Sequence, residues 1–510
     1  MNRRGLYILT IVLLLTSVCT SAQTRSLKRG LAYGHNSTQD LTVLSPGVSW
    51  WYNWYHQSEV SSFEGYNIDF VPMAWDATFD KNAMHTFLST HPSVKYILGW
   101  NEPNFTTQSN LTPKQAAAHW PDIESLADEF NLKIVSPAVN YCDKCVSEDG
   151  TTYGDPVQYL DAFFEACPNC RVDYIAIHNY MSNVSALQWY VGLFKKYNKP
   201  IWLTEFCSWE NVVTLSSQES YMIGAVDYLE NDPDVFRYAW FTGRQDSAYP
   251  YNAVLGGSGA LTELGNIYVN TPVHDSLSYA VIPTRIEAES YTKMNGILLE
   301  KTSDVSGMAN VGYIDAGDWL EYQVDALAKD TFNISFRVAV NQAASIALVV
   351  DNVPVETVSL AASGGWQNWV TVQAKDPVIL EGKHKVRLKA QTGGFNINWF
   401  ELKPPVIVTG VDDLLDNKST VVYPNPVDDK LIVNTSLKID RLTVYDLQGN
   451  VLHSGLDNVV DFSSIKPGLY LVKIISKDKI SCSTNSFMVT GSLLLLRKLC
   501  SKKLTLTKKE

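Results

Sequence analysis

Two short peptides carry the residue types that could do chemistry. Trp100–Asn104 (Trp-Asn-Glu-Pro-Asn) and Trp202–Phe206 (Trp-Leu-Thr-Glu-Phe) each place a glutamate at the end of an apolar run. Hydrolysis of a glycosidic bond needs two carboxylates that face each other across that bond. A barrel of parallel strands can supply such a pair from distant parts of a sequence. Glu102 and Glu205 are therefore candidate catalytic residues if the rest of the chain forms that barrel.

Eight apolar runs alternate with polar or helix-like stretches between residues 27 and 243. Most runs are nearly continuous in apolar residues, as strands buried on both faces are. Thr112, with Gln115 three residues on, predicts one helix start, and Ser216 predicts another. The alternation predicts an α/β fold, a (β/α)8 TIM barrel over residues 23–272. The runs are Leu27–Tyr33, Val48–Trp54, Ile68–Trp75, Tyr96–Asn101, Leu132–Val139, Val172–His178, Pro200–Glu205 and Phe236–Phe241.

Polar and aromatic side chains gather where these runs end. On this count Glu102 ends the fourth run and Glu205 the seventh. Barrel enzymes do their chemistry at the carboxyl ends of the strands. Five further residues fall at such ends and are expected near the glutamates: Asn53, Asn101, His178, Tyr180 and Trp240.

After the barrel, the sequence no longer shows helix-like stretches between its apolar runs. Residues 284–403 show short alternating runs broken by Gly, Asn and Pro, which predicts an all-β jelly-roll sandwich. Residues 404–418 form a linker that opens on two prolines, and residues 419–490 predict a second, small β-sandwich. Residues 491–510 fit neither unit and stay unassigned.

Bulk properties exclude some function classes and indicate export. The 510 residues suggest about three domains. A net charge of -12 disfavours nucleic acid as a partner. Residues 1–22 have a basic start, an apolar run and a small-residue site, which predicts a signal peptide. We expect no membrane span in the mature chain.

Two C-x-x-C pairs could bind zinc or form disulfides. If the flanking runs are parallel strands, Cys142 and Cys145 lie at the opposite end of the barrel from Cys167 and Cys170. A strand of about seven residues then separates the pairs by more than about 20 Å, too far for one zinc ion. In an exported protein we expect local disulfides instead.

The motifs of the barrel resemble glycoside hydrolase family 128, a family of β-1,3-glucanases. The similarity rests on Lys28–Ala32, Val48–Trp54, Val71–Trp75, Leu98–Asn104, Ile175–Tyr180 and Pro200–Phe206. The resemblance implies that Glu102 is the acid/base and Glu205 the nucleophile, without a cofactor for catalysis.

The same resemblance implies roles for neighbouring residues. Asn101 would hold a sugar hydroxyl, and His178 and Tyr180 would orient the nucleophile. Trp240 would form a sugar platform. The segment that would line further subsites comprises Trp51, Tyr52, Asn53 and Trp54.

Residues 285–402 resemble carbohydrate-binding module family 6 in the segments Arg285–Tyr291, Asn310–Tyr322, Gly364–Trp369 and Phe395–Trp399. This resemblance implies a sugar held between two aromatics and an amide. The expected residues are Tyr313, Trp366 and Asn396, with Asn398 as the alternative amide. Glu287 and Glu289 would bind a structural Ca²⁺.

Residues 420–490 resemble the C-terminal sorting domain of the type IX secretion route in Val422–Pro426, Val444–Gly449 and Leu469–Lys473. We therefore expect an exported or cell-surface, retaining endo-β-1,3-glucanase whose partners are β-glucan and the secretion machinery. Two alternatives remain: a hydrolase of another β-glycan, such as mixed-linkage glucan, and a non-catalytic glycan-binding protein.

Overall fold

The computed structural model describes residues 25–405, except positions 211, 246, 248, 276 and 306, and much of 420–488 in short segments. The chain divides into two units, residues 1–405 and 406–510. The first unit holds an α/β part and a β-rich part, which we call the module (residues 280–403). The expected signal peptide, the tail 491–510 and nearly all of the linker 404–418 lie outside the described residues.

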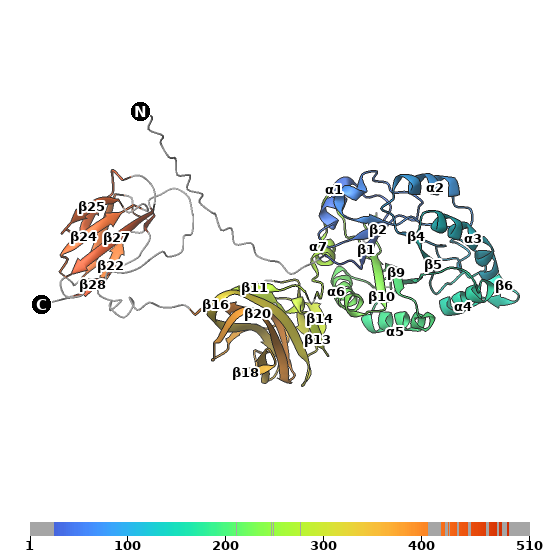
Figure 1. Cartoon of the computed structure of the whole chain (residues 1–510). Coiled ribbons are helices and arrows are strands. Elements are labelled where there is room, and N and C mark those ends of the chain that lie inside the picture. Colours follow the sequence, from blue (N-terminus) through green and yellow to red (C-terminus); the bar gives the residue numbers. More distant parts are fainter. Residues whose placement is uncertain are drawn as a thin grey trace, which may run out of the picture. The chain divides into compact units, whose positions relative to one another are not determined.

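The α/β part is built on one parallel sheet of eight strands (Figure 1). All eight predicted strands are present, so the alternation read from the sequence is confirmed. Parallel hydrogen bonding between Met73 and Leu98 joins the two edges of the sheet, as expected of a (β/α)8-like fold. In spatial order the strands are β3 (Asp69–Phe70), β2 (Trp50–Tyr52), β1 (Arg29–Ala32), β10 (Val235–Trp240), β9 (Ile201–Phe206), β8 (Tyr174–Asn179), β5 (Lys133–Val139) and β4 (Tyr96–Leu98).

Seven helices in the described part of the chain surround this sheet, and local caps start most of them (Figure 1). Thr112 and Gln115 form a capping box at the start of α3, as predicted. The predicted start of α6 at Ser216 is two residues late, because the Thr214 side chain is the cap and Ser217 completes the box. The helices are α1 (Thr38–Leu44), α2 (Lys81–Thr90), α3 (Pro113–Glu129), α4 (Pro156–Ala166), α5 (Val184–Phe194), α6 (Leu215–Asn231) and α7 (Glu263–Asn270).

The strands sort their side chains onto two faces. Trp50, Tyr52 and Ala239 belong to the cluster that fills the inside of the sheet. Trp51 and Trp240 belong to the larger cluster between the sheet and its helices. Successive residues of a strand point to opposite faces, so only one of each neighbouring pair reaches the inside.

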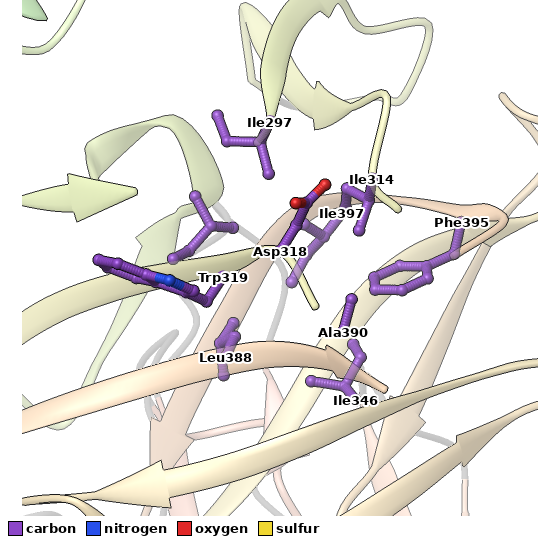
Figure 2. A pocket seen from close by; sticks show the side chains of 10 residues that line it. Ile297, Ile314, Asp318, Trp319, Ile346, Leu388, Ala390, Phe395 and Ile397 are labelled. Carbon is purple, nitrogen blue, oxygen red and sulfur yellow. The ribbon is translucent and has the colours of Figure 1, made fainter. Parts of the chain in front are cut away.

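The module is made of β-strands in the first unit. Strand β16 pairs with β20 over Trp319–Phe332 and with β21 over Asn333–Val340, so one strand contributes to both layers. A narrow apolar cavity lies inside this core, between Ile314, Leu388 and Phe395, and none of its lining residues comes from the barrel (Figure 2). The strands are β11 (Ala280–Ile282), β12 (Thr284–Glu287), β13 (Lys293–Asn295), β14 (Leu298–Lys301), β15 (Ala309–Gly312), β16 (Trp319–Val340), β17 (Ala344–Val350), β18 (Val353–Leu360), β19 (Trp369–Gln373), β20 (Val378–Thr392) and β21 (Phe395–Lys403).

The second unit is also built of strands, around a core that includes Leu431, Val444 and Phe462. Among the described residues, no helix is both long and apolar enough to span a bilayer. The strands are β22 (Thr420–Tyr423), β23 (Lys430–Thr435), β24 (Arg441–Tyr445), β25 (Val451–Gly455), β26 (Val459–Asp461), β27 (Leu469–Ser476), β28 (Lys479–Ser481) and β29 (Phe487–Met488).

Candidate active site

The two glutamates lie together at the carboxyl ends of β4 and β9. Glu205 is on β9, and Glu102 follows β4, where its backbone N–H donates to the Ala138 carbonyl at 2.9 Å. Both side chains are nearly buried, with residue exposures of 7% for Glu102 and 5% for Glu205. One oxygen of each carboxylate and one nitrogen of His178 all lie within 4.8 Å of one another. The sheet therefore brings together two carboxylates that are far apart in sequence.

The backbone at Glu102 is in the left-handed region, with φ of +42°. A residue with a side chain in that region stores about 1–3 kcal/mol and persists only when its surroundings enforce it. Here the Asn101 N–H donates to the Trp75 carbonyl at 2.9 Å and the Phe105 N–H donates to the Glu102 carbonyl at 3.0 Å. These bonds hold the Glu102 side chain in the cluster, which marks this turn as a candidate functional position.

Three neutral donors hold the Glu205 carboxylate. The Tyr52 hydroxyl donates to Oε1 at 2.9 Å and the Trp54 indole Nε1 donates to Oε1 at 2.7 Å. The Tyr180 hydroxyl donates to Oε2. Burial, followed by the negative charge of Glu205, raises the pKa of Tyr52 and of Tyr180 well above the ordinary value, so both phenols keep their protons. These three hydrogen bonds fix the orientation of the carboxylate.

His178 lies between the two carboxylates. Its Nδ1 is 2.9 Å from Glu102 Oε1 and 3.5 Å from Glu205 Oε2, and its side chain is fully buried. Burial lowers the pKa of His178, but the charges of Glu205 and Glu102 outweigh burial and raise it. The imidazole therefore contacts the expected acid/base more closely than the expected nucleophile, which the sequence had not indicated.

Asn101 precedes Glu102 and is nearly buried, with 4% exposure. Its Nδ2 donates to Gln108 Oε1 at 3.4 Å, and its Oδ1 has no hydrogen-bond partner among the described residues. A buried acceptor without a donor is costly, and a substrate hydroxyl could satisfy it. Asn53 instead braces its own loop, because its Nδ2 donates to the Gln57 carbonyl at 2.9 Å and to Glu59 at 2.8 Å.

Two of the predicted sugar-binding residues do not reach the site. Trp51 is fully buried against Phe63 and Phe70, and Trp240 is fully buried against Phe206 and donates to the Asn252 carbonyl. The prediction that Trp51 and Trp240 contact substrate is wrong. The reason is strand alternation, which turns both indoles outward toward the helices.

An exposed tryptophan that the sequence did not indicate lies beside Tyr180. Trp209 is 42% exposed, and its ring centroid is 5.8 Å from the ring of Tyr180 and 5.8 Å from that of Phe241. Phe241 in turn lies 5.9 Å from Trp54. Trp209 comes four residues after Glu205, so an aromatic just past a catalytic strand was the available signal.

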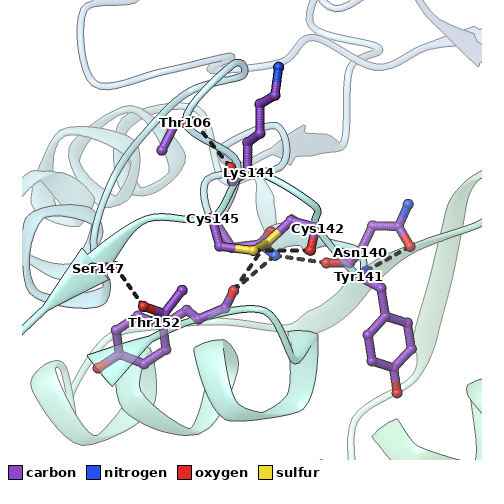
Figure 3. The surroundings of a disulfide bond; sticks show 10 residues. Thr106, Asn140, Tyr141, Cys142, Lys144, Cys145, Ser147 and Thr152 are labelled. Carbon is purple, nitrogen blue, oxygen red and sulfur yellow. Dashed lines mark hydrogen bonds between the residues drawn. A yellow bond between two sulfur atoms is a disulfide. The ribbon is translucent and has the colours of Figure 1, made fainter. Parts of the chain in front are cut away.

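Each C-x-x-C pair is joined by a disulfide in the structure, Cys142 to Cys145 and Cys167 to Cys170. The first disulfide braces the loop that follows Glu102. In that loop the Thr106 N–H donates to the Lys144 carbonyl at 2.8 Å (Figure 3). The second disulfide lies beyond the C-terminus of α4, before β8 begins, at the other end of the barrel.

The expected sugar-binding residues of the module lie close together, with two exposed aromatics beside a buried amide. Tyr313 and Trp366 are 63% and 48% exposed. Asn396 Nδ2 donates to the Trp366 carbonyl at 2.7 Å and to Glu300 Oε1 at 2.6 Å. A Cβ on Gly312, the residue before Tyr313, would lie 3.1 Å from Asn396 Oδ1. Glu300 was not predicted from the sequence, and it ties this group together.

Asn398, the alternative amide, makes a different contact. Its side chain is fully buried and its Nδ2 donates to Asp304 at 2.9 Å. Asn396, two positions earlier, is the amide that contacts the Trp366 loop.

The two expected calcium ligands differ in their surroundings. Glu287 is paired with Arg285 at 2.9 Å. Glu289 is buried, and its Oε2 has no hydrogen-bond partner among the described residues. Burial, with the negative charge of Glu287 in addition, raises the pKa of Glu289 to about 8. Carboxylate oxygens are ligands that Ca²⁺ prefers, and a cation bound beside Glu289 would favour the ionised form of this side chain.

Comparison with known proteins identifies three regions. Residues 30–268 match the family model described as the glycosyl hydrolase catalytic core. Residues 287–404 match the carbohydrate binding module of family 6, and residues 421–489 match the secretion system C-terminal sorting domain.

Individual relatives cover the barrel. The chain is 31% identical to alkali-sensitive linkage protein 1 of Schizosaccharomyces pombe over 48% of its own length and 44% of that protein, so less than half of this relative is covered. It is 39% identical to a solved GH128 (subgroup II) endo-beta-1,3-glucanase from Pseudomonas viridiflava, over 49% of this chain and all of that one, with a TM-score of 0.45. A second such enzyme, from Sorangium cellulosum, is 41% identical over the same shares, with a TM-score of 0.43.

These matches agree with the geometry of the site. The catalytic-core match spans all eight strands and both glutamates, and the module match spans Tyr313, Trp366 and Asn396. The protein is thus a glycoside hydrolase, with a glycosyl hydrolase catalytic core joined to a family 6 carbohydrate binding module and a secretion system C-terminal sorting domain.

Proposed function

We propose that this enzyme is a retaining endo-β-1,3-glucanase. One observation carries the mechanism: an oxygen of Glu102 and an oxygen of Glu205 lie within 4.8 Å of each other. Retaining glycosidases hold their two carboxyl groups about 5–5.5 Å apart, whereas inverting enzymes need about 6.5–9.5 Å to fit a water molecule. The short separation supports direct attack by one carboxylate on the sugar.

Each residue of the cluster then has a role. Glu102 protonates the oxygen of the leaving sugar, while Glu205 attacks the anomeric carbon and forms a glycosyl-enzyme. Glu102 next removes a proton from water, which attacks the same carbon and releases Glu205. Tyr52, Trp54 and Tyr180 hold the Glu205 carboxylate in its orientation, and His178 fixes the separation of the two carboxylates. No metal or organic cofactor takes part in this scheme.

The substrate assignment rests on the motif set of the barrel, which resembles family 128. Asn101 offers its buried Oδ1 to a sugar hydroxyl. Trp54, Trp209 and Phe241 form an aromatic surface next to Glu205 on which sugar rings can pack.

The other two units would bring the enzyme to its substrate, one by binding glycan and the other through export. In the module, Tyr313 and Trp366 would hold a glycan with Asn396, and Glu287 and Glu289 would bind a structural Ca²⁺. The sorting domain implies export, with residues 1–22 as a signal peptide and residues 404–418 as a linker. The proposed units are a closed (β/α)8 barrel at 23–272, a jelly-roll at 284–403 and a small sandwich at 419–490.

Incubation with β-1,3-glucan, mixed-linkage β-glucan, cellulose and xylan, with products separated by size, tests this function. A ladder of short oligosaccharides from β-1,3-glucan alone is the expected result. Release only from another polysaccharide would overturn the substrate, and binding without release from any would favour a non-catalytic glycan-binding protein. Proton NMR of the first product distinguishes retention from inversion.

A further inference from the structure

The module is attached to the barrel by a lysine on β14. Lys301 Nζ lies 2.6 Å from Glu219 Oε2 on α6 and 3.4 Å from Glu263 Oε1 on α7. The Glu219 side chain is only 1% exposed. A buried carboxylate is costly without its partner, so this ion pair holds β14 against these two helices.

The position of this contact on the barrel follows from topology. Helix α6 begins at Leu215, after the loop that leaves β9, and Glu219 is in its second turn. Glu263 is the first residue of α7, which follows the loop that leaves β10. In a barrel, each helix begins at the end where the preceding strand finishes. Lys301 therefore contacts the same end of the barrel that carries Glu102 and Glu205.

A second contact fixes the orientation of the module. Asp227 is eight residues after Glu219, about 12 Å farther along α6. Its Oδ1 accepts a hydrogen bond from the Tyr291 hydroxyl and lies 3.1 Å from His274 Nε2. The rings of His274 and Tyr291 stack at 4.0 Å, and all of these groups are largely buried. Two contacts this far apart on one rigid helix restrict rotation of the module.

The expected sugar-binding residues of the module are linked to this contact through the neighbouring residue of β14. Glu300 precedes Lys301 on β14, and neighbouring residues of a strand point to opposite faces. Glu300 Oε1 accepts from Asn396 Nδ2 at 2.6 Å and from Gln367 Nε2 at 2.8 Å. Gln367 follows Trp366, so the loop of that tryptophan is tied to the strand that contacts the catalytic end.

We propose that one glucan chain occupies the barrel cleft and the module surface at the same time, so that the module acts as a distant subsite of the enzyme. This inference rests on the proposed glucanase function. The module is mounted at the catalytic end by Lys301 and held in one orientation through Asp227. A chain that has bound Trp366 is then presented to the cleft at a high effective concentration.

The test compares Trp366→Ala with wild type in the full chain on a short and a long soluble β-1,3-glucan. We expect kcat/KM on the long glucan to fall about ten-fold or more through a higher KM, because the second binding site is lost. On laminaritriose, too short to reach both sites, kcat/KM should fall much less, so the ratio of kcat/KM on the long glucan to kcat/KM on laminaritriose should drop. Trp189→Ala is the matched control, since Trp189 is similarly exposed, at 54%, on the outer helix α5. An equal response of Trp366→Ala to both substrates, with weaker retention on insoluble glucan, would overturn the inference and leave the module as an independent anchor.

A second variant tests the mounting. Lys301→Glu places three carboxylates together and should loosen β14 from α6 and α7. We expect this variant to bind insoluble glucan as wild type does. Its ratio of kcat/KM on the long substrate to kcat/KM on the short one should fall several-fold. If Lys301→Glu keeps the wild-type ratio of kcat/KM on the long substrate to kcat/KM on the short one, a flexible connection is sufficient. The proposal that the module must be held in one orientation would then be overturned. A wild-type enzyme that releases nothing from β-1,3-glucan contradicts the proposed function instead, so the two failures are distinguishable.

Discussion

Removal of the Tyr52 hydroxyl tests how the nucleophile is held. Tyr52 is fully buried and donates to Glu205 Oε1 at 2.9 Å. In Tyr52→Phe that oxygen keeps only the Trp54 indole, and a buried site gives water little room to replace the phenol. A hydrogen bond to a charged group is worth about 1.5–3 kcal/mol.

The magnitude follows from this energy. The phenol holds the Glu205 carboxylate in the orientation for attack, so its loss should raise the barrier to forming the glycosyl-enzyme by up to this amount. Because about 1.4 kcal/mol corresponds to a ten-fold change in rate, kcat/KM should fall by about ten-fold to a hundred-fold.

The assay measures kcat/KM on a soluble oligosaccharide for wild type and two variants. Tyr159→Phe is the matched control, because Tyr159 is equally buried but donates to the Leu111 carbonyl at 2.8 Å, far from the carboxylates. It should lose about 1 kcal/mol of unfolding free energy and keep the wild-type kcat/KM. If a folded Tyr52→Phe also keeps the wild-type kcat/KM, the hydrogen bond from Tyr52 does not position the nucleophile.

Three further predictions address the other parts of the molecule. Glu205→Ala should lose several orders of magnitude in turnover and keep its fold, and azide should restore release of a glycosyl azide of inverted configuration; rescue only in variants of Glu102 would exchange the two roles. The pKa of Glu289 is raised to about 8 in the fold, so the folded state holds this proton more tightly than the unfolded chain. Without calcium, the melting temperature should therefore fall as the pH rises from about 4.5 to 8. Millimolar Ca²⁺ should abolish this loss and Glu289→Gln should reduce it, whereas a melting temperature indifferent to Ca²⁺ would argue against the site. Replacing the cysteines of Cys142–Cys145 by Ala should lower kcat from several-fold up to about a hundred-fold, since this disulfide braces the loop after Glu102. The same change at Cys167–Cys170, at the opposite end of the barrel, should leave kcat near wild type, and equal losses at both pairs would refute a specific role.

The sequence by itself determined the eight strands, the helix start at Thr112 and the ends of β4 and β9 where Glu102 and Glu205 lie. Strand burial explains this success, because strands covered on both faces are apolar along their whole length and are therefore easy to recognise. The same property hides the direction of each side chain. In a continuous apolar run nothing distinguishes the inner face from the outer face, so Trp51 and Trp240 were placed in the cleft although both point toward the helices.

Tertiary structure alone decided the contacts between segments. Irregular register in the pairing of β8 with β9 places His178 opposite Glu205 while its Nδ1 reaches Glu102, a position that local spacing does not encode. The pairing of Lys301 with Glu219 likewise joins residues 82 positions apart in two different folds. Local patterns fix which element forms, because they act through the backbone and the immediate neighbours. Which side chains meet depends on strand register and on the docking of the module, and these are set only when the whole unit packs.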